Sequence, residues 1–161
     1  TGHRRENFGD GFERICTAIA QLAHLHPYVD FVYPVHLNPN VREPVQRVLR
    51  GIGNVHLMEP LDYLPFVHLM GVSHLLLTDS GGIQEETTVM GVPCITMRDN
   101  TERPVTVTEG TNTLAGTDTA EIYSAFQKVT GPGQSFTPKR PQHWDGRAAS
   151  RIADVLHQCL T

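Results

Sequence analysis

The sequence is poor in cysteine, and its three cysteines, Cys16, Cys94 and Cys159, are too few and too widely spaced for a disulfide framework. Each lies in an apolar helix or strand pattern, so we expect buried thiols in a reducing compartment. The sequence also lacks Cys-x-x-Cys and His-Glu-x-x-His motifs, and His24 and His26 are two residues apart, a spacing that diverges on a helix. We therefore expect no metal site, and no motif indicates a cofactor.

Long hydrophobic runs are absent as well. No apolar run approaches the ~20 residues that a membrane-spanning helix needs, and the first residues have no signal-peptide pattern. Basic residues are not clustered beyond the pair Arg4 and Arg5, and the formal net charge is -4. These absences argue against membrane insertion, export, and binding to nucleic acid or anionic lipid, and they favour a cytoplasmic protein.

What is present is the composition of one globular domain, with 39% hydrophobic and 19% charged residues in a chain of 161. Apolar periodicity predicts strands over residues 31–36, 55–58, 75–77, 94–97 and 113–116, and helices over 12–23, 41–50, 62–70, 81–90 and 120–129. This alternation predicts an α/β fold, a doubly wound Rossmann-like parallel sheet with helices on both faces. A final helix beginning near Asp145 is expected to bury Ile152, Val155, Leu156 and Cys159.

The most informative stretch is the strand-to-helix elbow Thr78-Asp-Ser-Gly-Gly82, which follows three leucines. Ser80 is a favourable N-cap, and Gly81 and Gly82 leave the N–H groups of the first helical turn open to a ligand. Such a helix start suits a phosphate or diphosphate, and Glu86, one turn later, could accept hydrogen bonds from a ribose. The alternative is an ordinary capped turn with solvated acidic residues, because the pattern is neither a Walker loop nor a dinucleotide fingerprint.

Polar residues also gather in the other predicted connections from strand to helix. These segments are residues 3–7, 36–38, 62–66, 80–82 and 98–103. Because ligands bind at the carboxyl ends of parallel strands, we expect the five segments to form one rim. His3 and Arg103 would then supply cations around a diphosphate. The alternative interpretation is that both residues are ordinary surface charges.

These motifs together resemble the C-terminal half of the non-hydrolysing UDP-N-acetylglucosamine 2-epimerases. The resemblance rests on Gly2-His-Arg-Arg-Glu-Asn7, Tyr33-Pro-Val-His-Leu-Asn-Pro39, Tyr63-Leu-Pro-Phe66, Thr78-Asp-Ser-Gly-Gly-Ile-Gln-Glu-Glu86, Met97-Arg-Asp99, Thr101-Glu-Arg-Pro104 and Asp145-Gly-Arg147. It implies a type-B glycosyltransferase-like fold, in which two doubly wound domains face a cleft. Residues 1–161 would be the C-terminal, UDP-binding domain, and the N-terminal catalytic domain would lie outside this chain.

The resemblance assigns roles to individual residues. Ser80, Gly81 and Gly82 are expected to hold the diphosphate of UDP, and Glu86 is expected to hold the ribose. His3 and Arg103 are expected to line the same site, with His3 as the candidate catalytic residue. Leu61 and Phe66 are expected at the uracil. Arg4 and His36 match positions at which some bacterial members bind a second substrate molecule as an activator. Thr87-Thr88 replaces an Ala-Pro pair of some members, which leaves the specific sugar open.

The family reaction resembles an elimination followed by re-addition. A proton leaves C2 as UDP leaves C1, and reprotonation on the opposite face interconverts UDP-GlcNAc and UDP-ManNAc. The groups that transfer this proton lie in the N-terminal domain, so we expect this chain alone to bind UDP or UDP-GlcNAc without epimerising it. The full-length isomerase is expected to be a homodimer. A non-catalytic nucleotide-sugar sensor and the donor-binding domain of a related glycosyltransferase remain as alternatives.

The first ten residues form a polar loop with no predicted strand in front of it. Thr1-Gly-His3 resembles the end of a strand. We therefore expect an open slot beside the strand at residues 31–36, with exposed backbone donors and apolar surface.

Overall fold

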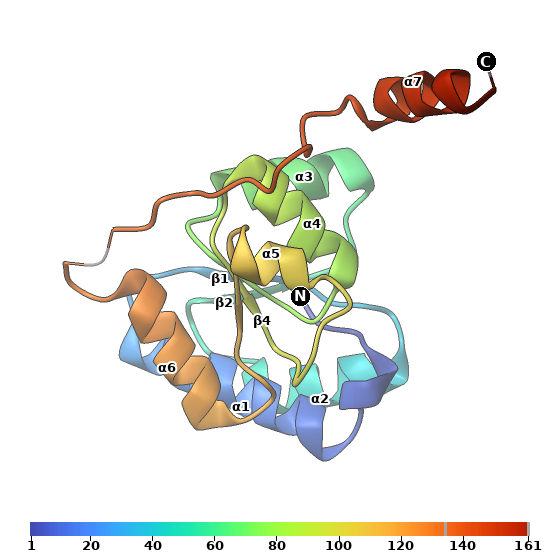
Figure 1. Cartoon of the computed structure of the whole chain (residues 1–161). Helices are drawn as coiled ribbons and strands as arrows, with labels where there is room; N and C mark the ends of the chain where they lie inside the picture. Colours follow the sequence, from blue (N-terminus) through green and yellow to red (C-terminus); the bar gives the residue numbers. More distant parts are fainter. Residues whose placement is uncertain (134, 161) are drawn as a thin grey trace.

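A computed structural model describes residues 1–133 and 135–160 and shows strands and helices alternating along the chain (Figure 1). The strands are β1 (Phe31–Pro34), β2 (Val55–Met58), β3 (Leu76–Thr78), β4 (Cys94–Thr96) and β5 (Asn112–Leu114). The helices are η1 (Arg5–Asn7), α1 (Asp10–Leu25), α2 (Pro39–Leu49), α3 (Tyr63–Val72), α4 (Gly81–Met90), α5 (Pro104–Thr108), α6 (Thr119–Thr130) and α7 (Ala148–Leu160). The predicted α/β fold is confirmed.

The strands are paired in parallel, as the alternation with helices requires. They form two sheets, β1-β2 and β3-β4-β5, with Tyr33 opposite Leu57 in the first and Ile95 opposite both Leu77 and Thr113 in the second. Helices α1, α2 and α6 lie on one side of the strands, and α3, α4 and α5 lie on the other (Figure 1). The carboxyl ends of the strands therefore lead into helices of both layers.

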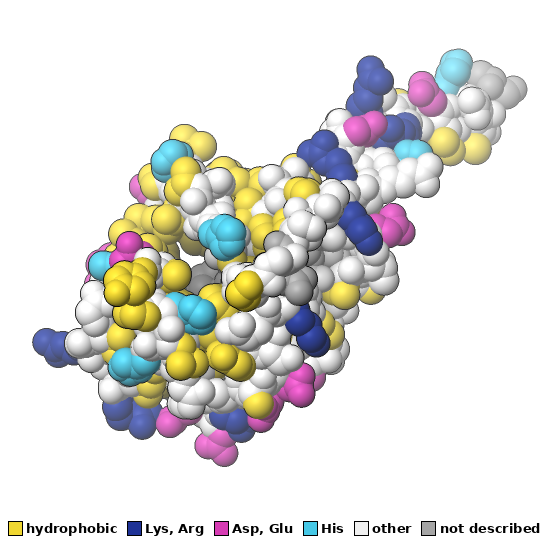
Figure 2. All heavy atoms as spheres, turned by 90° about the vertical axis from the view of Figure 1, so that its left-hand side faces the viewer, with side chains coloured by type: hydrophobic (Ala, Val, Ile, Leu, Met, Phe, Trp, Pro, Cys, Tyr) yellow, Lys and Arg dark blue, Asp and Glu magenta, His cyan; other side chains and the backbone are white. Residues whose placement is uncertain are grey.

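A cavity of about 590 Å³ separates the edge of β1 from the edge of β3. Its walls include Phe31–Pro34 of the first strand and Leu75–Leu77 beside the second, and Thr1 also lines it. Figure 2 shows a hollow with hydrophobic and histidine side chains around its mouth. The cavity lies where the sequence predicted an open slot, and it explains why the strands form two sheets and not one.

The main core is built on α1. The side chains predicted to face inward from this helix are all buried, namely Phe12, Ile15, Cys16, Ile19, Leu22 and Ala23. Helix α1 contacts α2 and α6, so its apolar stripe joins three helices to β1 and β4. A smaller cluster around Met70, Leu76 and Cys94 packs α3 and α4 on the other side of the strands.

Two of the three thiols are buried, as predicted. Burial raises the pKa of both Cys16 and Cys94 to about 12, so these thiols are protonated and unreactive at neutral pH. The prediction for Cys159 is wrong, because this residue on α7 is exposed.

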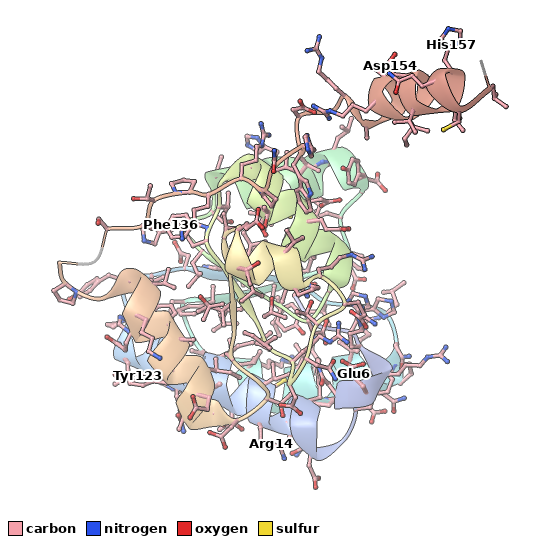
Figure 3. All side chains as sticks on the ribbon, in the orientation of Figure 1. Glu6, Arg14, Tyr123, Phe136, Asp154 and His157 are labelled. Carbon is pink, nitrogen blue, oxygen red and sulfur yellow. The ribbon has the colours of Figure 1, made fainter. Side chains whose placement is uncertain are left out.

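The predicted burial of helix α7 is wrong. Its apolar side chains Ile152, Val155 and Leu156 are 55–59% exposed, and the helix projects away from the rest of the domain (Figure 1). Asp154 and His157 lie on it far from the loop that carries Glu6 (Figure 3). Amphipathic spacing correctly predicted the helix and its apolar face, but spacing carries no information about which surface covers that face.

Candidate functional site

The elbow after β3 has the geometry of an anion site. Ser80 is the N-cap of α4 with extended backbone angles, and the helix ends at Gly91 in the left-handed region, as predicted. The first N–H groups of a helix have no intrahelical acceptor. A Cβ placed on Gly82 would meet nothing nearer than Ser80 Oγ at 4.0 Å, and Gly82 is exposed, whereas Gly81 is buried.

A cation lies beside this turn. A Cβ placed on Gly81 would lie 3.4 Å from a guanidinium nitrogen of Arg4, and the same guanidinium is 3.6 Å from a carboxylate oxygen of Glu102. The resemblance placed Arg4 at an activator site, and the structure brings it next to the predicted diphosphate site as well.

His3 lies at the same rim and stacks on His36. The two imidazole centroids are 5.4 Å apart, with 12° between the ring planes. Burial lowers the pKa of His3, and the carboxylate of Asp79 opposes this shift without cancelling it. A lowered pKa favours the neutral imidazole at pH 7 in the unliganded domain.

Arg98 links two of the predicted rim segments. Its side chain is 2% exposed and donates hydrogen bonds to Glu6 on η1 and to both carboxylate oxygens of Glu102. The hydrogen bonds from Arg98 lower the pKa of Glu102 to about 2. The loop at residues 98–103 is therefore tied to the loop at residues 3–7.

Asp79 links a further pair of segments. Its carboxylate accepts hydrogen bonds from the backbone N–H groups of His3 and Arg4 and from the side-chain amide of Asn7. Sequence reasoning named neither Asp79 nor Arg98 as a site residue. The available signal was a charged side chain immediately beyond the end of a buried strand, at β3 for Asp79 and near β4 for Arg98.

Glu86 and Arg103 flank the elbow. A Glu86 carboxylate oxygen is 3.5 Å from the hydroxyl of Tyr63, beside a cavity of about 270 Å³ between α3 and α4. Arg103 Nε is 2.7 Å from Glu85 Oε1, an ion pair that lacks the alignment of a hydrogen bond. Both residues are within the rim, but each is engaged by a neighbouring side chain.

The predicted uracil segment, residues 61–66, meets the elbow helix through Tyr63. Leu61 is half-buried just before α3. Phe66 lines the cavity between β1 and β3 and packs against the cluster around Met70 and Leu76. The structure therefore gathers Ser80, Gly81, Gly82, His3, Arg4 and His36, while Leu61 and Phe66 belong to a neighbouring element.

Across residues 1–133 and 135–160, no three or more His, Cys, Asp or Glu side chains are grouped so as to hold a metal ion. Within the same residues, no helix combines the length and apolarity needed to cross a membrane.

Comparisons with known proteins give the family. The sequence model of the UDP-N-acetylglucosamine 2-epimerase family matches residues 1–157. The chain belongs to this family. A probable UDP-N-acetylglucosamine 2-epimerase of Ralstonia nicotianae is 56% identical over 159 residues, which cover 97% of this chain and 42% of that protein. The resemblance inferred from the motifs is thus confirmed.

Solved structures agree. The UDP-GlcNAc 2-epimerase of Neisseria meningitidis bound to UDP-GlcNAc is 44% identical with a TM-score of 0.88, covering 98% of this chain and 43% of that chain. The Methanocaldococcus jannaschii enzyme in complex with UDP-GlcNAc and UDP is 30% identical with a TM-score of 0.80, covering 98% and 44%. This epimerase-family chain therefore spans about two fifths of the length of its relatives, and its fold matches one part of them.

Proposed function

We propose that residues 1–161 are the C-terminal, UDP-binding domain of an isomerase that interconverts UDP-GlcNAc and UDP-ManNAc. The observation that carries the proposal is the first turn of α4, where Gly82 is exposed and the guanidinium of Arg4 lies beside Gly81. A helix N-terminus with an adjacent cation suits a diphosphate. Relatives crystallised with UDP-GlcNAc or UDP support this choice of ligand.

The diphosphate lies on Ser80, Gly81 and Gly82 in this proposal. Glu86 follows one helical turn after the glycines, so its carboxylate can accept the ribose hydroxyls on the same side of the helix. The uracil binds beyond the ribose, against the backbone at Leu61 and near Phe66. The Tyr63 hydroxyl lies 3.5 Å from a carboxylate oxygen of Glu86, so α3 borders the proposed ribose site.

The chemical contribution of this domain is to stabilise the leaving group. When the C1–O bond breaks, negative charge grows on the diphosphate, and preorganised donors stabilise that charge more than they stabilise the ground state. Each hydrogen bond to a charged group contributes about 1.5–3 kcal/mol. His3 contributes an N–H donor from a neutral imidazole, and Arg103 contributes a cation once its ion pair with Glu85 opens.

The remaining parts of the proposal concern the full-length protein. The N-terminal domain supplies the groups that remove the proton from C2 and return it, and the full-length protein acts as a cytoplasmic homodimer. Arg4 and His36 form the side of the activator site that this domain contributes. No cofactor takes part in the proposed reaction.

Two measurements test the proposal. Calorimetry on the 161-residue chain should detect binding of UDP, and the same chain should not convert UDP-GlcNAc into UDP-ManNAc. The full-length protein should carry out that conversion. Absence of UDP binding would contradict the domain assignment, whereas UDP binding by a full-length protein without conversion would favour a nucleotide-sugar sensor.

A further inference from the structure

Asp79 is a fully buried carboxylate between the two loops that form the anion site. It directly precedes Ser80, and its side chain is 0% exposed. The N–H of His3 lies 3.0 and 3.1 Å from its two oxygens, the N–H of Arg4 lies 2.9 Å from Oδ2, and the amide of Asn7 lies 3.1 Å from Oδ2. All of these contacts are donors, so the buried charge is compensated by hydrogen bonds.

The partners of Asp79 lie 72 to 76 residues away in the sequence. The carboxylate of Asp79 therefore engages the backbone donors of His3 and Arg4, and these two N–H groups are not open to a ligand.

The same hydrogen bonds fix the backbone from which the His3 ring projects. The ring is 40% exposed, its Nδ1 lies 3.8 Å from Asp79 Oδ1, and it stacks on His36. Asp79 is also covalently joined to Ser80, so one residue sets the distance between the imidazole and the diphosphate elbow. We propose that Asp79 is the positioning residue for His3, acting through it without contacting the substrate.

This inference rests on the proposed function, in which His3 acts on the leaving group. Asp79→Asn keeps the size of the side chain but replaces one acceptor with a donor, which faces the His3 N–H even when the amide oxygen takes the Oδ2 position. A donor facing a donor displaces the loop, and a misplacement of about 1 Å in a catalytic group costs about a hundredfold in rate. UDP binding should weaken by a smaller factor than kcat, because the α4 donors and Glu86 are not moved, whereas the displaced loop carries His3 and Arg4.

The test uses the full-length enzyme, with kcat, KM and the dissociation constant for UDP measured for Asp79→Asn. Asn112→Ala is the matched control, because Asn112 is also a buried polar residue but bonds to Gln84 and Thr88, away from the His3 loop. The control should lose thermal stability without a comparable loss of kcat. If Asp79→Asn fails to fold, Asp79→Glu keeps the charge and moves the carboxylate by one methylene, and it should show the same loss of kcat.

A double-mutant cycle separates positioning from general damage. In a His3→Ala background, Asp79→Asn should lower kcat by less than about threefold, because its effect passes through the missing ring. Equal losses in both backgrounds, or a parallel loss of UDP affinity, would overturn the proposal.

A readout without catalysis separates this inference from the proposed function. In proton–carbon NMR of the 161-residue chain, the His3 imidazole signal, assigned by its loss in His3→Ala, should move in Asp79→Asn and stay in place in Asn112→Ala. An unmoved His3 signal contradicts the positioning role. A wild-type enzyme that binds UDP and shows the NMR shift but does not epimerise contradicts the proposed function alone.

Discussion

The guanidinium of Arg98 donates to both carboxylate oxygens of Glu102, at 2.7 and 2.9 Å. These bonds hold the pKa of Glu102 near 2, below the ordinary value of 4.5. Because the pKa is depressed in the folded state, the ion pair contributes stability above pH 4.5, and this contribution is lost as the pH falls toward 2. Acidification in this window should therefore weaken the connection between two loops of the site.

We predict that Glu102→Gln is less stable than wild type at pH 7 and loses less stability between pH 4.5 and 2. Urea unfolding at a series of pH values measures both effects. Glu59→Gln is the control, because it breaks the exposed ion pair with Arg42 outside the site. The low pKa of Asp145, held by Arg151, leaves a second acid-sensitive contribution in every variant. Equal acid losses in wild type and Glu102→Gln would refute the prediction.

Gly110 lies where a side chain has no room. A Cβ there would be 2.4 Å from the carbonyl oxygen of Thr106 and 2.7 Å from Thr88 Oγ1. Gly110→Ala should therefore destabilise the domain by about 1–3 kcal/mol, as overpacking does. Gly53→Ala is the matched control, since a Cβ at Gly53 meets nothing within 4 Å. Chemical denaturation compares the two, and similar stabilities would show that α5 shifts to make room.

The sequence predicted the elements that local chemistry determines. Helix α1 follows from six apolar positions on one stripe, and α4 follows from Ser80 before it and Gly91 after it. Helix α5 was missed, because only five residues form it and its first turn depends on a hydrogen bond from Thr106 Oγ1 to the carbonyl of Arg103. A short helix held by one such contact leaves no periodicity to detect.

The parts of the site that the sequence could not supply depend on distant partners. The glycines of the elbow are recognisable alone, but Asp79 and Arg98 gain their roles from residues 72 to 92 positions away. The burial of α7 was predicted wrongly for a related reason, since none of the described residues of this helix is buried. Local pattern therefore predicts an element, while its partners are set by the fold.

The cavity between β1 and β3 predicts a gain in stability on extension. A run of the protein's own residues upstream of Thr1 should enter this cavity as a strand and pair with both edges. Each 1 kcal/mol gained raises the melting temperature of a domain of this size by roughly 2–4 °C. Calorimetry on the extended chain measures the rise, and a Gly-Ser extension of equal length is the control. An unchanged melting temperature would show that no strand occupies the cavity.

A substitution at Gly82 should affect UDP binding and the stability of the domain in opposite directions. The site of its Cβ is open space, and alanine is more favourable than glycine inside a helix by about 1 kcal/mol. Gly82→Ala should therefore keep or raise the melting temperature while it weakens UDP binding at least about tenfold, because the methyl group occupies the approach to the backbone donors. Unchanged UDP affinity would place the diphosphate elsewhere.

The last prediction distinguishes the ribose contact of Glu86 from the contacts to the diphosphate. The ribose keeps its charge during the reaction, so a contact from Glu86 stabilises the ground state and the transition state equally. Loss of such a uniform contact raises KM and leaves kcat nearly intact, and this is the expected behaviour of Glu86→Gln in the full-length enzyme.

Groups at the diphosphate should behave differently, because charge grows there as the C1–O bond breaks. Ser80→Ala, Arg103→Ala and His3→Ala should each lower kcat by roughly ten- to a hundredfold, which corresponds to the loss of a charge-assisted hydrogen bond of about 1.5–3 kcal/mol. Steady-state kinetics on the four variants measure the difference. A Glu86→Gln enzyme that kept its KM and lost kcat would mean that Glu86 acts on the reacting sugar, and the nucleotide would then run along α4 in a different direction.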